Sequence, residues 1–363
     1  MKKRTGGRWR GVPRALRGAA VVVVLGVGVA GCRGADASPG VIELKLGHAS
    51  SPGSLVAVTA EEFVRRVNEE LAGQVHISLF GSGQLGGDEV LTIKLRLGTV
   101  DFALPSTTLS STIEPFGFFE VPYLIRDRDH LALIEERIFW PYIAPYADEM
   151  DFGILALWEH GFRQITNNAR PIVHPSDLAG IKLRVPSGFW RIAAFQAFGA
   201  NPTPMPLTEV FVALQTGVLD GQENPLPQIY ASRFQEVQRY LSLSNHVYSP
   251  VFVTVGARKW ATHPPEVRAA IERIAREVQE FSRAEGERMD VAIRQEIGVS
   301  VAINEVDRDA FIAASQPIYE HFGSIVPEGL QWIEMALALE DELDASATVI
   351  PPASTSAPLD GDQ

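Results

Sequence analysis

The sequence is poor in cysteine, with a single one, Cys32, among 363 residues. One cysteine cannot form an internal disulfide or supply the clustered thiolates of a cysteine-rich zinc site. Basic residues are also in the minority, because 32 Lys and Arg stand against 44 Asp and Glu, a formal net charge of −12. This balance disfavours electrostatic binding of nucleic acid. A hydrophobic share of 46% with 21% charged residues is ordinary for a folded, globular chain.

Motifs of several common enzyme classes are missing as well. The eight histidines show no H-x-x-x-H spacing, and the chain has neither a G-x-S-x-G nucleophile elbow nor a G-x-x-x-x-G-K-[ST] phosphate loop. Residues Gly81–Gly86 do match G-x-G-x-x-G, but Asp101 precedes the expected strand Phe102–Leu104 instead of ending a strand, as a ribose-binding acid would. We therefore interpret this motif as a tight loop, and we expect no cofactor, no metal and no enzymatic activity.

The apolar run Ala19–Ala30 is too short to span a bilayer, which takes about 20 residues. Seven basic residues precede the run and no acidic residue occurs before Cys32, which is the pattern of an export signal. The run ends in Val29-Ala30-Gly31-Cys32, which resembles a bacterial lipobox, whose cysteine carries a lipid. We expect residues 1–32 to be a lipoprotein signal peptide and the protein to be periplasmic and anchored to a membrane through Cys32. The alternative is an ordinary secretory signal with a chance cysteine.

Removal of residues 1–32 would make the chain still more acidic. Without the seven basic residues, 25 remain against 44 acidic ones, a formal net charge of −19. Such a protein repels an anionic ligand at long range, so a site for an anion has to supply its own cations.

Hydrophobic periodicity predicts two α/β units after a linker at 33–40. Strands at Val41–Gly47, Val75–Phe80 and Phe102–Leu104 alternate with helices at Leu55–Leu71 and Glu89–Leu97. A second unit contains a strand at Ile181–Pro186 and a helix at Thr208–Thr216 capped by Thr208, and the strand Gly153–Trp158 leads into it. We expect a first lobe from 41–160 with about 250–290, and a second from 161–249 with about 291–340.

A helix of roughly thirty residues follows Pro264-Pro265, because Val267, Ile271, Ile274 and Val278 keep helical spacing. At a rise of about 1.5 Å per residue it would extend more than about 40 Å, long enough to cross both lobes. The tail at 345–363 is rich in Pro, Ser, Thr and Asp, and we expect it to be disordered.

Arg184 lies near the carboxyl end of the predicted strand Ile181–Pro186. Ligands of open α/β sheets bind beyond the carboxyl ends of strands, and a guanidinium group fits a carboxylate through two parallel hydrogen bonds. The residues alone leave a second interpretation open, in which Arg184 is a solvated arginine at a sheet edge.

Several ordered motifs resemble the extracytoplasmic solute-binding subunit of TRAP transporters, the DctP-like family. They are Gly161–Asn168, Asp177–Pro186 and Glu209–Pro225, with Gly83-Gln84-Leu85-Gly86 and Val121-Pro122-Tyr123-Leu124 upstream. The likeness extends from about Val41 to about Leu337. It implies a two-lobe, periplasmic-binding-protein-like α/β fold with crossing hinge strands and a long helix spanning both lobes, and TRAP membrane subunits as partners.

The resemblance also implies roles for individual residues. Arg184 would clamp the ligand carboxylate, Asn224 would hydrogen-bond the same ligand, and Arg163 would add a second cationic contact near the hinge. Ser106 stands about where sialic-acid-binding members carry a glutamate, which disfavours sialic acid as the ligand.

Where some members have an aromatic residue beside the pocket, this chain has Leu207. Trp190, Phe252 and Tyr248 are candidates to wall the pocket instead, although each is more typical of core packing.

The sequence thus predicts capture of a small carboxylate for an ion-gradient-driven transporter. A binding protein that serves a sensor and an exported enzyme remain as alternatives. A 2-oxo acid, a C4-dicarboxylate, a sugar acid and an ectoine-like zwitterion all fit two arginines and an asparagine.

Overall fold

The computed structural model describes residues 40–348. The predicted signal peptide, Cys32, the linker up to residue 39 and residues 349–363 of the predicted tail lie outside the described residues. None of the helices between residues 40 and 348 combines the length and the apolar character that a bilayer crossing requires.

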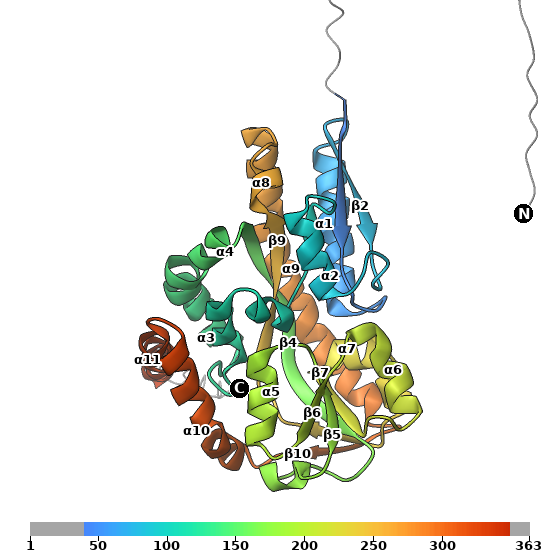
Figure 1. Cartoon of the computed structure of the whole chain (residues 1–363), viewed down its shortest axis with the longest axis vertical. Coiled ribbons are helices and arrows are strands. Elements are labelled where there is room, and N and C mark those ends of the chain that lie inside the picture. Colours follow the sequence, from blue (N-terminus) through green and yellow to red (C-terminus); the bar gives the residue numbers. More distant parts are fainter. Residues whose placement is uncertain (1–39, 349–363) are drawn as a thin grey trace, which may run out of the picture. The chain divides into compact units, whose positions relative to one another are not determined.

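The first lobe has the predicted alternation of strands and helices (Figure 1). Its elements are β1 (Ile42–Gly47), α1 (Leu55–Glu70), β2 (Val75–Phe80), α2 (Asp88–Arg96) and β3 (Phe102–Ala103). β1 pairs in parallel with both β2 and β3. The apolar face of α1 covers this sheet, since Phe63 and Val67 are buried in one cluster with Leu44 and Leu46 of β1.

Two long antiparallel strands, β4 (Phe152–Asn167) and β9 (Tyr248–Gly256), cross between the lobes. β9 also pairs with β3, whereas the last residues of β4 pair with β7 (Gly221–Pro225) and β8 (Tyr240–Leu243). The sequence predicts only Gly153–Trp158 as a strand here. β4 continues through residues 159–167, most of which are polar and buried, and the burial of polar side chains conceals the strand from a hydrophobicity pattern.

The second lobe is built around three neighbouring strands, in the order β7, β5 (Lys182–Val185) and β6 (Asn201–Pro204). Its helices are α5 (Phe189–Ala197), α6 (Leu207–Gln215) and α7 (Leu226–Ala231), and β10 (Ala302–Glu305) pairs with β8. The prediction that Thr208 caps α6 is wrong, because the helix begins at Leu207 after Pro206 and has no side-chain cap. Pro206, with φ −55°, fixes the start of the helix through its ring.

The long helix predicted after Pro264 is α9 (Pro265–Ile297), with 33 residues. Its first half packs into the apolar cluster of the first lobe through Val267, Ile271 and Val278. Its second half packs into the second lobe through Met289 and Ile293. Figure 1 shows α9, in orange, passing from α1 toward α7, so the helix spans both lobes as predicted.

The C-terminal helices α10 (Arg308–Ile325) and α11 (Gly329–Thr348) pack against different parts of the chain. α10 contacts α5 of the second lobe, whereas α11 contacts α3 (Arg128–Ile134), which comes from the first-lobe part of the sequence. Residues 345–348, predicted to be disordered, form the last turn of α11, because that helix continues without a proline until after residue 348. Shorter helices fill the connections: Thr107–Ser111, Glu114–Glu120, Glu135–Ile143, Pro145–Glu149 (α4), Pro175–Leu178, Phe234–Glu236 and Ala257–Trp260 (α8).

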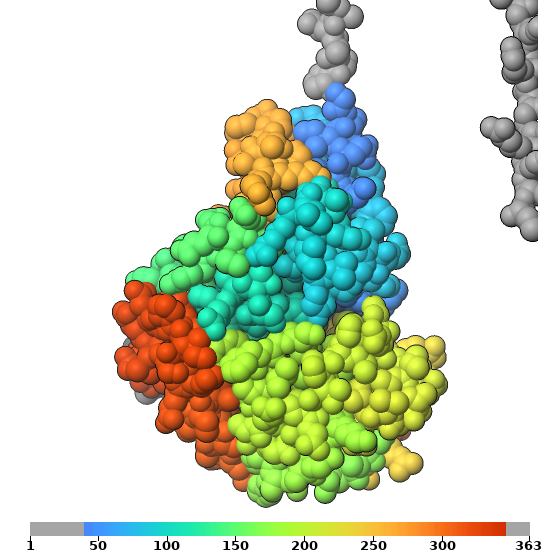
Figure 2. All heavy atoms as spheres, viewed as in Figure 1, coloured from blue at the N-terminus to red at the C-terminus, as the bar shows by residue number. Residues whose placement is uncertain are grey.

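The two lobes contact each other directly, away from the hinge strands that connect them. The Ser51 hydroxyl of the first lobe lies 2.9 Å from the Ser232 hydroxyl of the second, and Ser111 donates a hydrogen bond to the Ser187 carbonyl at 3.4 Å. Figure 2 shows the atoms of the first lobe, blue to teal, meeting those of the second, green to yellow, in one seam. The structure is therefore a closed arrangement of the lobes.

Candidate functional site

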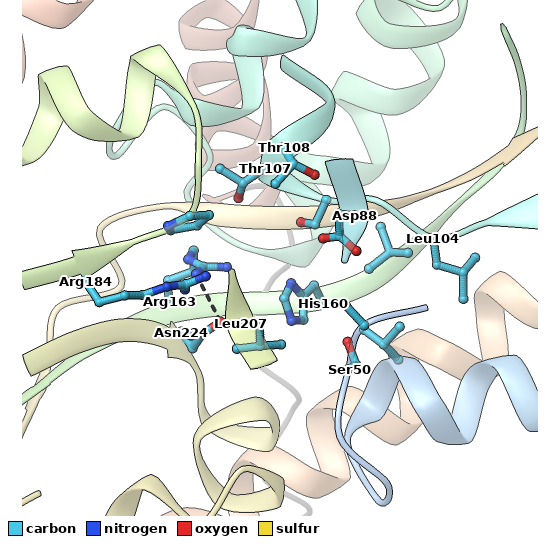
Figure 3. Close-up of a pocket in the computed structure, with 15 residues that line it drawn as sticks. Ser50, Asp88, Leu104, Thr107, Thr108, His160, Arg163, Arg184, Leu207 and Asn224 are labelled. Atoms are coloured by element: carbon cyan, nitrogen blue, oxygen red, sulfur yellow. Dashed lines mark hydrogen bonds between the residues drawn. The ribbon is translucent and has the colours of Figure 1, made fainter. Parts of the chain in front are cut away.

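A small cavity of about 40 Å³ lies between the lobes. The carboxyl ends of β3 and β5, the crossing strand β4 and the start of α2 border it (Figure 3). Four of the five predicted ligand-binding residues line this cavity: Ser106, Arg163, Arg184 and Asn224. The other lining residues are Ala49, Ser50, Val56, Asp88, Leu104, Thr107, Thr108, His160, Pro186, Leu207 and Val251.

Arg184 is a buried arginine, 3% exposed, on a strand that pairs with β6 on one side and β7 on the other, so it is not on an edge strand. This position rules out the solvated edge arginine that the sequence left open. Its Nε and Nη2 both donate to the Met205 carbonyl, at 2.8 and 2.6 Å. Burial lowers the pKa of Arg184 to about 10, so the guanidinium stays charged at neutral pH. Among residues 40–348, no carboxylate lies within ion-pair distance of it.

Arg163 is equally buried, but its charge is already paired. Its Nε and Nη2 donate to the two carboxylate oxygens of Glu223 at 2.5 and 2.9 Å, across the β4–β7 pair. Its Nη2 also donates to Asn224 Oδ1 at 3.1 Å, the contact drawn as a dashed line in Figure 3. Arg163 thus fixes the position of Asn224 rather than presenting an unpaired charge to the cavity.

Glu223 joins this arginine to a wider buried network. Arg191 of α5 donates to Glu223 at 2.6 Å and to Glu120 at 2.6 Å. Burial alone would raise the pKa of Glu223, but Arg163 and Arg191 hold it well below its usual range. His246 lies 3.1 Å from Glu223, and burial lowers the pKa of His246 to about 4, so it is neutral. The network holds two arginines and two carboxyl groups.

Other polar groups border the cavity. His160 of β4 is 8% exposed, and neither of its ring nitrogens has a hydrogen-bond partner among the described residues. Burial lowers the pKa of His160 to about 3, so the ring is neutral. The Thr108 hydroxyl lies beside the Asp88 carboxyl group. Asp88, at the first turn of α2, is partly buried, and burial together with the neighbouring Glu89 raises its pKa to about 7.

Sequence reasoning missed Asp88, His160, Arg191, Glu120 and Glu223 as parts of this region. Glu223 lies inside the Asp220–Pro225 motif, so the motif could have identified it as a residue of the site. The pairing of Arg191 with Glu120 could not be identified in this way, because the two residues are 71 positions apart in the chain.

Trp190, the fifth predicted residue, does not border the cavity. It is 1% exposed and packs edge-on against Phe322 of α10, with ring centroids 5.2 Å apart. Phe252 and Tyr248 are core residues too, with ring centroids 4.9 Å from Phe116 and 5.1 Å from Phe162 respectively. These aromatic side chains pack against other rings in the hydrophobic core. The apolar wall of the cavity is formed instead by Val56, Leu104, Leu207 and Val251.

Ser106 does border the cavity, but its hydroxyl donates to the Pro250 carbonyl at 2.7 Å. The glycine-rich segment Gly81–Gly86 is a tight loop between β2 and α2, closed by a hydrogen bond from the Gly86 amide to the Gly83 carbonyl. Asp101 pairs with Lys259 at 2.7 Å. Residues 40–348 contain no cluster of three or more histidine, cysteine or acidic side chains arranged to hold a metal ion.

Comparison with known proteins shows which protein family the chain resembles. The family model described as bacterial extracellular solute-binding protein, family 7 (DctP), matches residues 46–324. The chain is also 32% identical over 291 residues to the 2,3-diketo-L-gulonate-binding periplasmic protein YiaO of Escherichia coli, an alignment that covers 79% of this chain and 88% of YiaO.

Two solved structures show the same fold. The sugar acid binding protein DctPAm from Advenella mimigardefordensis, in complex with galactonate, is 29% identical with a TM-score of 0.79, over 84% of this chain and 99% of that one. A TRAP periplasmic solute binding protein from Sulfurospirillum deleyianum with bound succinate is 31% identical with a TM-score of 0.77, over 83% and 99% of the two chains. The two-lobe α/β fold expected from the sequence is confirmed.

The family match extends through both lobes and includes the hinge strands β4 and β9 and the whole of α9. The residues that form the cavity therefore all lie within the matched part of the chain. The chain belongs to family 7 of the bacterial extracellular solute-binding proteins, the DctP family, and is a solute-binding protein of the TRAP type.

Proposed function

We propose that this protein captures a small organic acid outside the cytoplasmic membrane and passes it, unchanged, to the membrane subunits of an ion-gradient-driven TRAP transporter. The observation that carries the proposal is Arg184, a buried cation that borders the cavity without a carboxylate partner among residues 40–348. A ligand carboxylate would supply the missing charge where the dielectric constant is low and a paired charge gains most. The galactonate and succinate bound by similar proteins are both carboxylates.

The orientation of Arg184 supports this role. A guanidinium has five N–H donors, and two of those in Arg184 are directed at the Met205 carbonyl. These two hydrogen bonds hold the plane of the group, which lowers the entropy lost when a carboxylate binds. The other three N–H groups are left for the ligand, enough for a pair of parallel hydrogen bonds.

Asn224 is the second proposed ligand contact. Its Oδ1 accepts from Arg163 and its Nδ2 donates to Gln222 Oε1 at 2.6 Å, so the orientation of the amide is set on both sides. One N–H of the amide is left for the ligand. We assign Arg163 a positioning role toward Asn224, with its charge shared with Glu223, and Ser106 a place in the wall.

Closure of the lobes would follow binding. The ligand carboxylate would bridge Arg184 of the second lobe to groups of the first, and β4, β9 and α9 would bend as the hinge. We propose that the closed, loaded form is the one that docks on the membrane subunits.

We also propose that residues 1–32 direct export and that Cys32 carries a lipid. A Cys32→Ser variant should then move from the membrane fraction to the soluble extracytoplasmic fraction. Equal fractionation of the variant and the wild type would contradict the anchor and leave the ligand proposal untouched.

A thermal-shift screen of the purified protein tests the proposed ligand class. A panel should contain aliphatic acids, dicarboxylates, sugar acids and the neutral sugars that match them. A true ligand at about 100 times its Kd adds about 2.7 kcal/mol, a rise in Tm of about 5 °C for a protein of this size.

We expect at least one acid to raise the Tm and its neutral counterpart to have no effect. Lys182→Ala, on the same strand but exposed, is the matched control for Arg184→Ala and should keep the response. Recovery of the bound acid unchanged after long incubation would support capture without turnover. Stabilisation by neutral sugars alone would overturn the proposal.

A further inference from the structure

The polar groups of the cavity are divided between two ends. Arg184, Arg163 and Asn224 come from strands of the second lobe and the hinge, and Figure 3 shows them together on one side. Asp88 and His160 lie on the other side of the view. The two ends differ in charge, and this difference bears on which acids the site accepts.

Arg184 is the one cavity-lining cation among the described residues that lacks a carboxylate partner. The only other lining cation there, Arg163, is bound to both oxygens of Glu223. One unpaired buried cation can balance one ligand carboxylate. A second carboxylate on the same ligand would have to be buried without a counter-charge, which is costly at low dielectric constant.

The opposite end offers hydrogen bonds rather than positive charge. The neutral ring of His160 provides one donor and one acceptor, both unpartnered among the described residues, and the Thr108 hydroxyl lies beside Asp88. Asp88 forms no ion pair with any described residue, and its charged neighbours are Glu89, which repels it, and Arg184. Such a set matches alcohol groups, which donate and accept hydrogen bonds in turn.

We propose that the site takes a monocarboxylate that carries several hydroxyl groups, and that Asp88 selects against a second carboxylate. The inference rests on the proposed function and goes further, because the fold and the family do not decide it: similar proteins bind galactonate, a monocarboxylate, and succinate, a dicarboxylate. The carboxylate binds at Arg184, and the hydroxyl groups reach His160, Thr108 and Asp88.

Dicarboxylates and aliphatic monocarboxylates are expected to bind weakly for different reasons. A dicarboxylate of the same length places its second negative charge beside Asp88 with no cation to balance it. An aliphatic monocarboxylate satisfies Arg184 but leaves the two ring nitrogens of His160 buried without hydrogen bonds. A site built to bind hydroxyl groups discriminates strongly against ligands that lack them, because its own polar groups are then left unpaired.

Calorimetric titration with matched acids tests the inference. Aldonates and aldarates of one configuration, such as gluconate with glucarate and galactonate with galactarate, differ only in whether the far carbon is an alcohol or a carboxylate. Hexanoate is the analogue without hydroxyl groups. We expect at least one aldonate to bind at least 30-fold more tightly than its aldarate, and hexanoate to bind more weakly still.

The titrations are made at pH 9, where Asp88, whose pKa burial raises to about 7, is charged. Asp88→Asn then removes the charge and keeps the shape. For the aldonate that binds best, this variant should reduce the preference over the aldarate at least tenfold, chiefly by tighter binding of the aldarate. Asp129→Asn, an exposed aspartate at the start of α3, is the matched control and should leave the ratio unchanged.

Wild-type protein that binds succinate, glucarate or hexanoate as tightly as any aldonate would overturn the ligand class, while binding through Arg184 would still stand. An unchanged ratio in Asp88→Asn would overturn the role of Asp88. Loss of all carboxylate binding in the panel would instead count against the proposed function itself.

Discussion

Arg184 and Arg163 are both buried arginines beside the same cavity, yet they differ in what surrounds them. Arg163 lies between Glu223 and Asn224, and its charge is balanced by the protein. Arg184 contacts a backbone carbonyl only, which solvates the cation without neutralising it. The difference arises from position, because Arg163 pairs across two strands, whereas Arg184 lies one residue before the end of β5, beside the cavity.

Glu223→Gln should destabilise the protein strongly. The change leaves Arg163 and Arg191 buried with only one carboxylate, that of Glu120, between them. Breaking a buried ion pair on one side costs about 3–5 kcal/mol, a fall in Tm of about 6–9 °C here. Thermal unfolding of the unliganded variant measures this loss of stability. The control is Glu236→Gln at an exposed position, whose stability should stay within about 0.5 kcal/mol of the wild type. Equal Tm values for the two variants would show that the network adds little stability.

His160 makes stability depend on pH. The unfolded chain binds a proton at this residue near pH 6.5, whereas the folded chain does so only near pH 3. Between these values the unfolded state holds more protons, so the contribution is complete above pH 6.5 and is lost as the pH falls. Relative to His160→Gln, the wild type should lose about 1 kcal/mol per pH unit between pH 6 and 4. A stability difference that does not change over this range would refute the assignment of a neutral, buried ring.

Helix α9 is the element that ties the two lobes together, and its contact with β4 depends on a glycine. A Cβ added at Gly286 would lie 2.6 Å from Glu159 Oε1 and 3.0 Å from the Leu55 side chain. The Glu159 carboxylate cannot retreat easily, because Arg128 holds it and also contacts Asp290 of α9. The absence of a side chain at Gly286 therefore allows helix and strand to approach at the hinge.

Gly286→Ala sets two effects against each other. Alanine favours the helix by about 1 kcal/mol, whereas overpacking at this contact costs about 1–3 kcal/mol. Since Glu159 is held in place, we expect a net loss of about 1 kcal/mol in the free energy of denaturant-induced unfolding. Glu287→Ala, at the neighbouring exposed position, is the control, because Glu287 takes no part in the contact between α9 and β4. A variant Gly286→Ala that is more stable than the wild type would mean that the helix and strand separate freely.

Secondary-structure patterns predicted most of the elements that frame the site but not the residues that complete it. The strand that carries Arg184 and the helix α9 have regular apolar spacing, so both were predictable. The later part of β4 was not, because its residues are polar and buried by pairing with distant partners such as Glu223. Trp190 looked like a pocket wall because an aromatic side chain gives no sign, in sequence, of which surface it packs against.

For the molecule as a whole, affinity for a ligand depends on how favourable the closed arrangement is. Contacts between the lobes outside the cavity stabilise closure without touching the ligand. The hydrogen bond between Ser51 and Ser232 is such a contact, and neither residue lines the cavity. A hydrogen bond of this kind contributes about 0.5–1.5 kcal/mol.

Ser51→Ala should therefore weaken ligand binding about 2- to 10-fold while leaving the Tm of the unliganded protein nearly unchanged. Calorimetric titration measures the affinity, and Ser324→Ala, on the exposed face of α10 far along the chain, serves as the control. Wild-type affinity in Ser51→Ala would indicate that this contact between the lobes does not contribute to closure.

The central claim is that Arg184 supplies the charge that captures a carboxylate. Isothermal titration of the best acid from the screen, with wild type, Arg184→Ala and Lys182→Ala side by side, tests it most directly. We predict a loss of at least 100-fold in affinity for Arg184→Ala, because the ligand charge would be buried unpaired, and wild-type affinity for Lys182→Ala. Affinity within a few fold of wild type in a folded Arg184→Ala variant would contradict the account.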